Sequence, residues 1–273
     1  MWIKKSEISR LSAEVKNLIA GEEVDLRDHR EGPLKILRND IHTLASYKTE
    51  RVKVLQEERD ILKDTLADIS HQIKTPLTSL MIMSELLEDA PPEKQHEFIA
   101  NIQTTLHRTE WLVSTLLKLA KLDANAVTFN RQPIPTTELI RQGVLPLKIQ
   151  LELKEQELVI NGAEVIECDK RWTAEALGNI IKNASDHSPK GSSILIEAGR
   201  NPICGWISVK DAGKGLERSQ IARVFKRFQG DNPHGYGIGL PLALTIMKNQ
   251  SGDIHVEGGS KGEGATFTLK FFK

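Results

Sequence analysis

A single histidine in a strongly helical stretch is the first residue that could do chemistry. His71 lies within DISHQIKTPLTSL, residues 68–80, with Gln72 beside it and with Thr75 and Pro76 one turn further on. A neutral imidazole is a nucleophile and could accept a phosphoryl group. An isolated surface histidine is usually inert, so this chemistry depends on what the rest of the chain supplies.

Two asparagines four residues apart could help to hold a metal ion. The segment NIIKN places Asn179 and Asn183 on one face of an expected helix. Their amide oxygens could together hold a hydrated Mg²⁺ near phosphates, because this ion prefers oxygen ligands. Taken alone, such a pair is more often two surface or capping amides.

Two glycine-containing segments are candidates for binding a nucleotide. In VKDAGKGL, Asp211 precedes Gly213 and Gly215, so its carboxylate could accept a hydrogen bond from an adenine amino group while the backbone approaches the ring. In HGYGIGLPLALTIM, a second row of glycines leads into a helix at Leu240, whose free amide groups favour a polyphosphate. The glycines of this row are Gly235, Gly237 and Gly239. Their spacing matches neither the Walker nor the dinucleotide motif, which implies another nucleotide fold.

A heptad pattern of apolar residues surrounds the histidine. From Ile41 to Leu87 the seam positions recur at alternating spacings of four and three. Lys48 and Arg59 interrupt the apolar character upstream, and from Leu62 onward it is continuous except at Pro76. The segment EDAPPEK then breaks the helix. The same spacing resumes at Ile102, Leu106, Thr109, Val113, Leu116 and Ala120. We expect an antiparallel helical hairpin whose apolar seam is covered by a second copy, giving a four-helix dimer.

The heptad also predicts how His71 is presented. The histidine lies two residues after Ile69 and two before Ile73, on the face turned away from the seam and toward solvent. Pro76 removes the helical hydrogen bond to the carbonyl of Gln72, so we expect a bend just past the histidine.

Beyond Asp123 the pattern changes to short β-rich runs that alternate with helical stretches. The runs are AVTFNRQPI, SSILIEAGR, CGWISVKDAG, DIHVEGG and GATFTLKFF. The helical stretches lie around residues 139–153, 172–186 and 240–249. We predict an α/β layer with helices on one face of a sheet, and a division into a linker over residues 1–40, a hairpin over 41–124 and a catalytic domain over 125–273.

Composition narrows the classes of function and location. Basic and acidic residues both number 37 of 273, so no excess of positive charge favours a nucleic acid as partner. Only Cys168 and Cys204 are present, which excludes a disulfide framework and favours a reducing compartment. No apolar run approaches the roughly 20 residues that span a bilayer, so we expect a cytoplasmic chain. The opening MWIKK fits equally an ordinary chain start and the cytoplasmic edge of a membrane helix in a longer parent protein.

Taken in order, these motifs resemble those of the sensor histidine kinases of two-component signalling. SHQIKTPL looks like the phosphoacceptor box, NIIKNASDHSP like the asparagine box, DAGKGL and GYGIGLPLAL like the two glycine boxes, and VFKRF like the phenylalanine box. The resemblance covers roughly residues 62–273. It implies an α+β protein, with a helical-hairpin dimerisation domain that forms a four-helix bundle as a dimer. An α/β-sandwich ATP-binding domain of the type shared with gyrase, Hsp90 and MutL would follow.

The resemblance also implies roles for individual residues. His71 would take the γ-phosphoryl group of ATP and pass it to an aspartate of a response regulator, and Thr75 matches the position associated with dephosphorylating that regulator. Asn183 would hold Mg²⁺ with Asn179 beside it, and Asp211 would read adenine. The nucleotide and its lid, which includes GDNPH at residues 230–234, would be lined by Gly213, Gly215, Gly235, Gly237, Gly239 and Leu240.

Several positions depart from the family pattern. Gln72 stands where an acidic residue is usual, and an amide can orient the imidazole ring but cannot take its proton near pH 7. Asp186 and His187 replace a lysine and an aromatic residue, and Gln229 and Gly230 replace an aromatic residue and an arginine. We expect Lys214, Lys226 or Arg227 to balance the negative charge of the phosphates in place of the missing lysine and arginine.

The sequence therefore favours an ATP-dependent protein-histidine kinase that acts as a homodimer. Two alternatives stay open. One is an ATPase or serine kinase of the same nucleotide fold, which the hairpin bearing HQIKTPL disfavours. The other is a catalytically weak scaffold whose hairpin only docks a partner.

Overall fold

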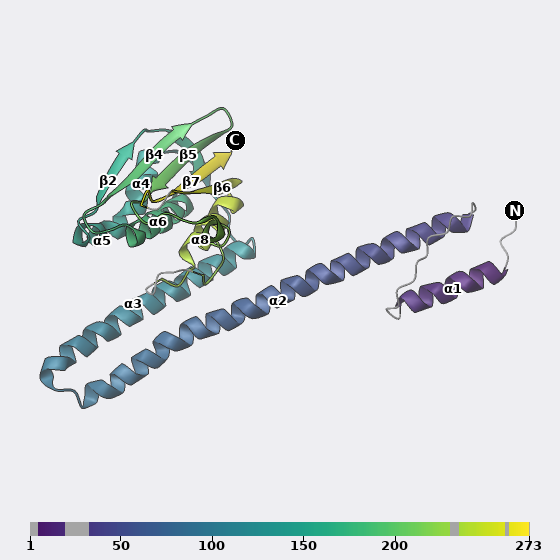
Figure 1. Ribbon diagram of the computed structural model, residues 1–273, viewed down its shortest axis with the longest axis horizontal. Coiled ribbons are helices and arrows are strands. Elements are labelled where there is room, and N and C mark those ends of the chain that lie inside the picture. Colours follow the sequence, from purple (N-terminus) through teal and green to yellow (C-terminus); the bar gives the residue numbers. More distant parts are fainter. Residues whose placement is uncertain (1–4, 20–32, 230–234, 260–261, 273) are drawn as a thin grey trace. The chain divides into compact units, whose positions relative to one another are not determined.

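The computed structural model describes residues 5–19, 33–229, 235–259 and 262–272 (Figure 1). Residues 1–4, which hold most of the MWIKK segment, and the predicted lid at residues 230–234 lie outside the described residues. Contacts between Cα atoms divide the chain into two compact units, with the boundary between Ser70 and His71. In the parts that the structure describes, no helix combines the length and apolar character that crossing a membrane requires.

The first unit contains helix α1 (Lys5–Ile19) and the beginning of helix α2 (Pro33–Glu88). Leu11 of α1 is buried, and the guanidinium of Arg38 lies 3.1 Å from a carboxylate oxygen of Glu14. Helix α2 begins inside the predicted linker, at Pro33, because proline is well suited to the first turn of a helix.

The predicted helical break is confirmed in the second unit. Helix α2 ends at Glu88, and α3 (Pro92–Asp123) begins with a proline in its first turn. The last part of α2 and α3 run antiparallel (Figure 1). Pro76 is buried within α2, which continues through it as one helix.

Helix α3 buries a face that the heptad pattern does not predict. Leu112, Leu119 and Leu122 are at most 2% exposed and belong to the main apolar core, because this half of α3 packs against helix α8 (Gly239–Asn249). The predicted seam position Val113 is exposed in the single chain, as expected for a side chain that a second copy would cover. The heptad therefore located the helix correctly but missed its contact with the α/β domain.

The α/β domain contains two sheets. A two-stranded antiparallel sheet pairs β1 (Arg131–Pro135) with β3 (Val165–Asp169). A five-stranded mixed sheet has the order β2-β4-β5-β7-β6, in which β2 and β4 are parallel and the other neighbours antiparallel. Its strands are β2 (Glu157–Asn161), β4 (Ser193–Arg200), β5 (Cys204–Lys210), β6 (Gly252–Gly258) and β7 (Ala265–Phe272).

Helices cover one face of the five-stranded sheet, as predicted (Figure 1). Alternate residues of β4 and β7 are buried against them, as the two-residue period of a strand requires. The helices of this domain besides α8 are α4 (Thr136–Val144), the 3₁₀ helix η1 (Leu145–Leu147), α5 (Lys148–Leu153), α6 (Lys170–His187) and α7 (Arg218–Ile221).

Candidate nucleotide-binding site

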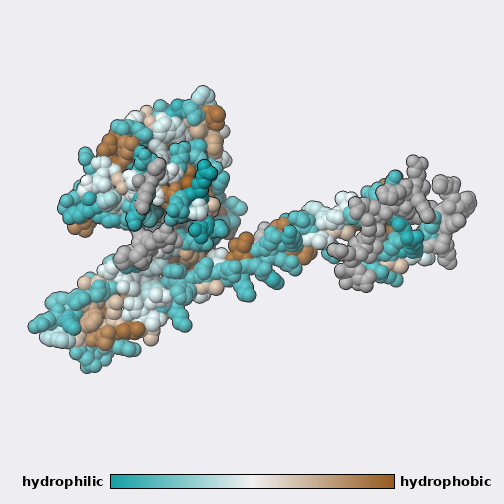
Figure 2. All heavy atoms as spheres, viewed as in Figure 1, coloured by the Kyte–Doolittle hydropathy of each residue, from teal (hydrophilic) through white to brown (hydrophobic). Residues whose placement is uncertain are grey.

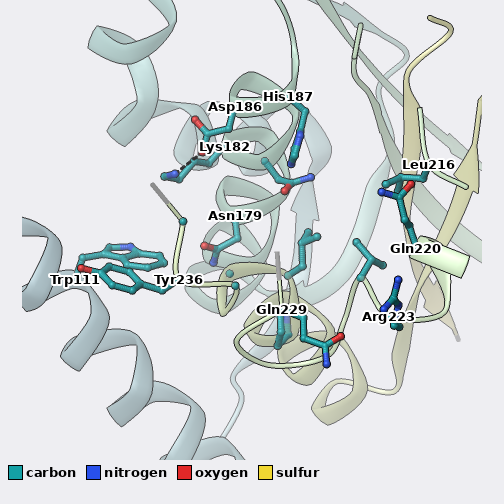
Figure 3. A pocket seen from close by; sticks show the side chains of 17 residues that line it. Trp111, Asn179, Lys182, Asp186, His187, Leu216, Gln220, Arg223, Gln229 and Tyr236 are labelled. Carbon is teal, nitrogen blue, oxygen red and sulfur yellow. Dashed lines mark hydrogen bonds and ion pairs between the residues drawn. The ribbon is translucent and has the colours of Figure 1, made fainter. Parts of the chain in front are cut away.

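One face of helix α6 forms a wall of a cavity of about 390 Å³ (Figure 3). The helix begins after Asp169, whose carboxylate accepts a hydrogen bond from the backbone N–H of Trp172 at 3.0 Å. Apolar residues of α6, including Ile180 and Ile181, are fully buried in the core. The opposite, polar positions recur three and four residues apart and face the cavity; they are Asn179, Lys182, Asn183 and Asp186.

The structure brings the two predicted asparagines together on this wall. The side-chain nitrogen of Asn179 donates to the backbone carbonyl of Glu175 at 3.0 Å, which fixes the amide. A Cβ atom placed on Gly239 would lie 3.0 Å from the amide oxygen of Asn179, so that oxygen faces the second glycine row. This arrangement offers oxygen ligands to a hydrated Mg²⁺ held between the asparagines and a polyphosphate. In the described residues no group of three His, Cys, Asp or Glu side chains could hold a metal by itself.

The second glycine row forms the opposite wall. Gly235, Gly237, Gly239 and Leu240 all line the cavity, and α8 begins at Gly239. The residues of the first turn of α8 line the cavity. The first N–H groups of a helix have no carbonyl partner within it, so those of Gly239 and Leu240 favour an anion there, whereas Pro241 has no N–H. Gly237 has φ +64°, and a Cβ there would lie 2.7 Å from the backbone oxygen of Gln229, so no other residue fits without movement.

The predicted adenine-reading residue is buried beside the cavity. One carboxylate oxygen of Asp211, Oδ1, accepts from the backbone N–H groups of Gly213 at 2.8 Å and of Ala265 at 3.1 Å, which fixes the side chain. A Cβ on Gly213 would lie 2.8 Å from the backbone oxygen of His187, a residue that does line the cavity. Asp211, Gly213 and Gly215 themselves are not among the described residues that line it.

An aromatic pair that sequence reasoning missed closes one side of the cavity. The rings of Trp111 on α3 and Tyr236 in the glycine row are stacked, with centroids 6.2 Å apart and planes inclined by 21° (Figure 3). Both residues line the cavity. Helix α3 thus contributes to a site that the sequence had assigned to the catalytic domain alone. A contact between segments 125 positions apart leaves no local signal in the sequence.

The cations of the cavity also differ from those expected. Lys182 and Arg223 line it, whereas none of the three predicted cations is among the described lining residues. Arg227 is engaged elsewhere, because its guanidinium makes two hydrogen bonds of 2.8 and 2.9 Å to the carboxylate of Asp123 at the end of α3. A second ion pair between α3 and the α/β domain joins Lys118 of α3 and Glu175 of α6 at 2.7 Å.

The candidate phosphoacceptor lies outside the cavity. His71 is exposed on α2, as the heptad predicts, and Gln72 is half-buried. The hydroxyl of Thr75 donates to the backbone carbonyl of His71 at 3.1 Å, one turn back along the helix. His71 is not among the described residues that line the cavity.

Comparison with known proteins identifies two domains in the chain. Residues 61–125 match the His kinase A phospho-acceptor domain, and residues 168–273 match the family of histidine kinase-, DNA gyrase B- and HSP90-like ATPases. These matches fall on the hairpin with His71 and on the α/β domain with the cavity. The chain therefore belongs to the sensor histidine kinases of two-component systems.

Individual relatives agree with this assignment. The chain is 32% identical over 242 residues to the sensor histidine kinase WalK of Bacillus subtilis, covering 82% of this chain and 38% of WalK. It is 28% identical over 224 residues to sporulation kinase C of the same organism, covering 81% of this chain and 51% of the relative. It therefore spans about half the length of these relatives or less.

A solved histidine kinase shares the fold. The structure of histidine kinase ThkA in complex with the response regulator protein TrrA aligns with a TM-score of 0.66 at 20% identity. The alignment covers 83% of this chain and 66% of that one.

Proposed function

We propose that this chain is an ATP-dependent protein-histidine kinase that phosphorylates His71 and passes the phosphoryl group to an aspartate of a response regulator. The observation that carries the proposal is the cavity, in which the amide face of α6 stands opposite the first turn of α8. The phospho-acceptor domain in the same chain supplies the group that would receive the phosphate.

The cavity suits the triphosphate end of ATP. The free N–H groups at the start of α8 would bind phosphate oxygens, and Asn179 and Asn183 would hold a Mg²⁺ ion against them. Asp211 would read adenine through the carboxylate oxygen that is not occupied by backbone donors among the described residues. Mg²⁺, when bound, would supply positive charge that offsets the charge developing on the transferred group.

Phosphoryl transfer requires little covalent participation by the protein. A ring nitrogen of neutral His71 would attack the γ-phosphorus, the bond from that phosphorus to the bridging oxygen would break, and ADP would leave. The proton on the other ring nitrogen would pass to water, because Gln72 can accept a hydrogen bond but cannot act as a base. A carboxylate oxygen of the regulator aspartate would then attack the same phosphorus and regenerate the histidine. Thr75, one turn from His71, would assist in dephosphorylating that aspartate.

We also propose that the hairpin pairs with a second copy. Figure 2 shows apolar side chains at the surface of the hairpin. Large exposed apolar side chains on helical hairpins are typical of surfaces that a partner covers. Within residues 71–123 they are Leu77, Met81, Ile82, Leu86, Ile99, Leu106, Trp111, Val113 and Leu117.

One incubation tests the proposed function against its alternatives. The chain is mixed with γ-labelled ATP and Mg²⁺ and then treated with acid or with alkali. A kinase gives protein-bound label that is labile in acid and stable in alkali. Free phosphate without labelled protein would indicate an ATPase, acid-stable label a serine kinase, and no turnover a scaffold.

A further inference from the structure

Lys182 and Asp186 form an ion pair on the wall that carries the two asparagines. The ammonium of Lys182 lies 2.6 Å from the Oδ2 oxygen of Asp186, one helical turn along α6. Figure 3 shows this pair at the cavity, on the same side as the stacked aromatic rings. The Lys182 side chain is 39% exposed and that of Asp186 is 18% exposed, so the lysine is the more accessible partner.

We propose that Lys182 is the cation that binds the phosphates of the nucleotide, and that Asp186 holds it in place until the nucleotide arrives. This inference rests on the proposed function, because it names the residue of the same cavity that balances the negative charge of ATP. Lysine suits the role because its ammonium is a compact charge on a flexible stem and is a common ligand of phosphate.

The other cation of the cavity is placed differently. Arg223 lies across the cavity from Lys182, near α7 (Figure 3). Its Nε donates to the backbone carbonyl of Ser219 at 3.3 Å, which ties its guanidinium to that wall. Of these two cations, only Lys182 lies on the face of α6 that carries Asn179 and Asn183, where we expect Mg²⁺ and the phosphates to bind.

Asp186 can release Lys182 without being left unpaired. The other carboxylate oxygen of Asp186, Oδ1, accepts from the side-chain nitrogen of Gln150 at 2.9 Å and lies 3.5 Å from the ammonium of Lys154. Lys154 is itself fixed by a 2.8 Å hydrogen bond to the backbone carbonyl of Ser185. These donors come from α5 and the residue after it, outside the cavity lining, so they would keep Asp186 compensated when Lys182 turns to a phosphate.

The two halves of the pair therefore have opposite expected effects on ATP affinity. Replacing Lys182→Gln removes a charge-assisted hydrogen bond to phosphate, which weakens ATP binding about tenfold. Replacing Asp186→Asn removes both a competitor for the lysine and a negative charge near the phosphates, so ATP binding becomes tighter, by up to about tenfold. A purely structural ion pair would instead make both variants bind ATP more weakly.

Calorimetric titration of the whole chain with ATP, ADP and adenosine, each with Mg²⁺, tests the inference. We expect Lys182→Gln to lose affinity for ATP and ADP and to keep that for adenosine, which has no phosphate. Lys182→Arg should retain the affinity of the parent for ATP to within about threefold, because it keeps the charge. The matched control is Lys248→Gln, which breaks a 3.0 Å ion pair with Asp253 at the far end of α8 and should change none of the three affinities.

The outcomes separate this inference from the proposed function. The role of Lys182 is wrong if Lys182→Gln and the parent show the same ratio of ATP affinity to adenosine affinity. It is also wrong if Asp186→Asn weakens ATP binding as much as Lys182→Gln does. In both cases the proposal that the chain binds a nucleotide is unaffected. If the parent chain binds neither ATP nor ADP, the proposed function fails and the inference fails with it. Circular dichroism of each variant checks that it is folded.

Discussion

Gly237 is a position where one added methyl group should directly damage the proposed nucleotide site. Its φ of +64° is unfavourable for alanine by about 1 to 2 kcal/mol. The added Cβ would also lie 2.7, 2.8 and 3.0 Å from backbone atoms of Gln229, and forcing extra atoms into a packed region costs about 1 to 3 kcal/mol more. The sum of about 2 to 5 kcal/mol can be relieved only if the glycine row moves away from Gln229.

Such movement would displace the cavity wall. The backbone N–H of Phe228 donates to the carbonyl of Gly237 at 3.0 Å, so the phenylalanine box and the glycine row would shift together or separate. We therefore expect Gly237→Ala to weaken ATP binding by tenfold or more and to lower stability by at least about 2 kcal/mol. Titration calorimetry and urea unfolding measure the two effects.

Gly191 provides a matched control for this prediction. It has φ +75°, but a Cβ there would meet no atom within 4 Å, and the residue lies outside the cavity lining. Gly191→Ala should therefore lose only the conformational part, about 1 to 2 kcal/mol, and should bind ATP normally. Equal losses of stability in the two variants, together with parent-like ATP binding by Gly237→Ala, would show that the contact with Gln229 does not shape the cavity.

Three further predictions concern catalysis, the contact between α3 and the α/β domain, and the effect of pH. Gln72→Glu should speed autophosphorylation about tenfold in single-turnover labelling between pH 6 and 8, because a carboxylate can take the ring proton; an unchanged rate at every pH would assign Gln72 only to orientation. A double-mutant cycle of Arg227→Ala and Asp123→Ala should give a coupling of at most about 1 kcal/mol, because the side chains are 33% and 44% exposed, and a larger value would contradict a solvent-screened pair. Hydrogen bonds, chiefly from Arg141, lower the pKa of Glu138 from 4.5 to about 2. The ionised carboxylate therefore stabilises the folded state above pH 4.5, and this stabilisation is lost as the pH falls toward 2. Glu138→Gln should thus be less stable than the parent at pH 7, and the difference in Tm should shrink below pH 4.5; a constant difference would refute the assignment.

Local signals in the sequence predicted most elements of the fold. The double proline after Glu88 ends one helix and opens the next, and the β-rich runs after Asp123 mark β1, β4, β5, β6 and β7. Strands β2 (ELVIN) and β3 (VIECD) were missed because apolar residues stand next to each other in both, rather than alternating with polar ones. The predicted helical stretch over residues 139–153 is interrupted at η1, because Pro146 cannot donate a helical hydrogen bond.

The site was predicted where a motif is local and missed where it depends on distant contacts. Asn179 and Asn183 lie one turn apart on a single helix, so their shared face follows from the spacing alone. Trp111 reaches the cavity only because the C-terminal half of α3 packs on α8, which no heptad rule contains. The contact between α3 and the α/β domain also pairs Arg227 with Asp123, and this explains why this arginine of the phenylalanine box does not line the cavity.

The most direct test of His71 as the phosphoacceptor is to locate the phosphoryl group after incubation with γ-labelled ATP and Mg²⁺. We expect acid-labile label on the parent chain, no label on His71→Gln, and unchanged ATP affinity in that variant, because His71 does not line the part of the proposed nucleotide cavity that the structure describes. His96→Gln, which changes another exposed histidine of the same hairpin, should be labelled like the parent. Label that persists on His71→Gln, or that disappears equally from His96→Gln, would contradict the assignment of His71 as the phosphoacceptor.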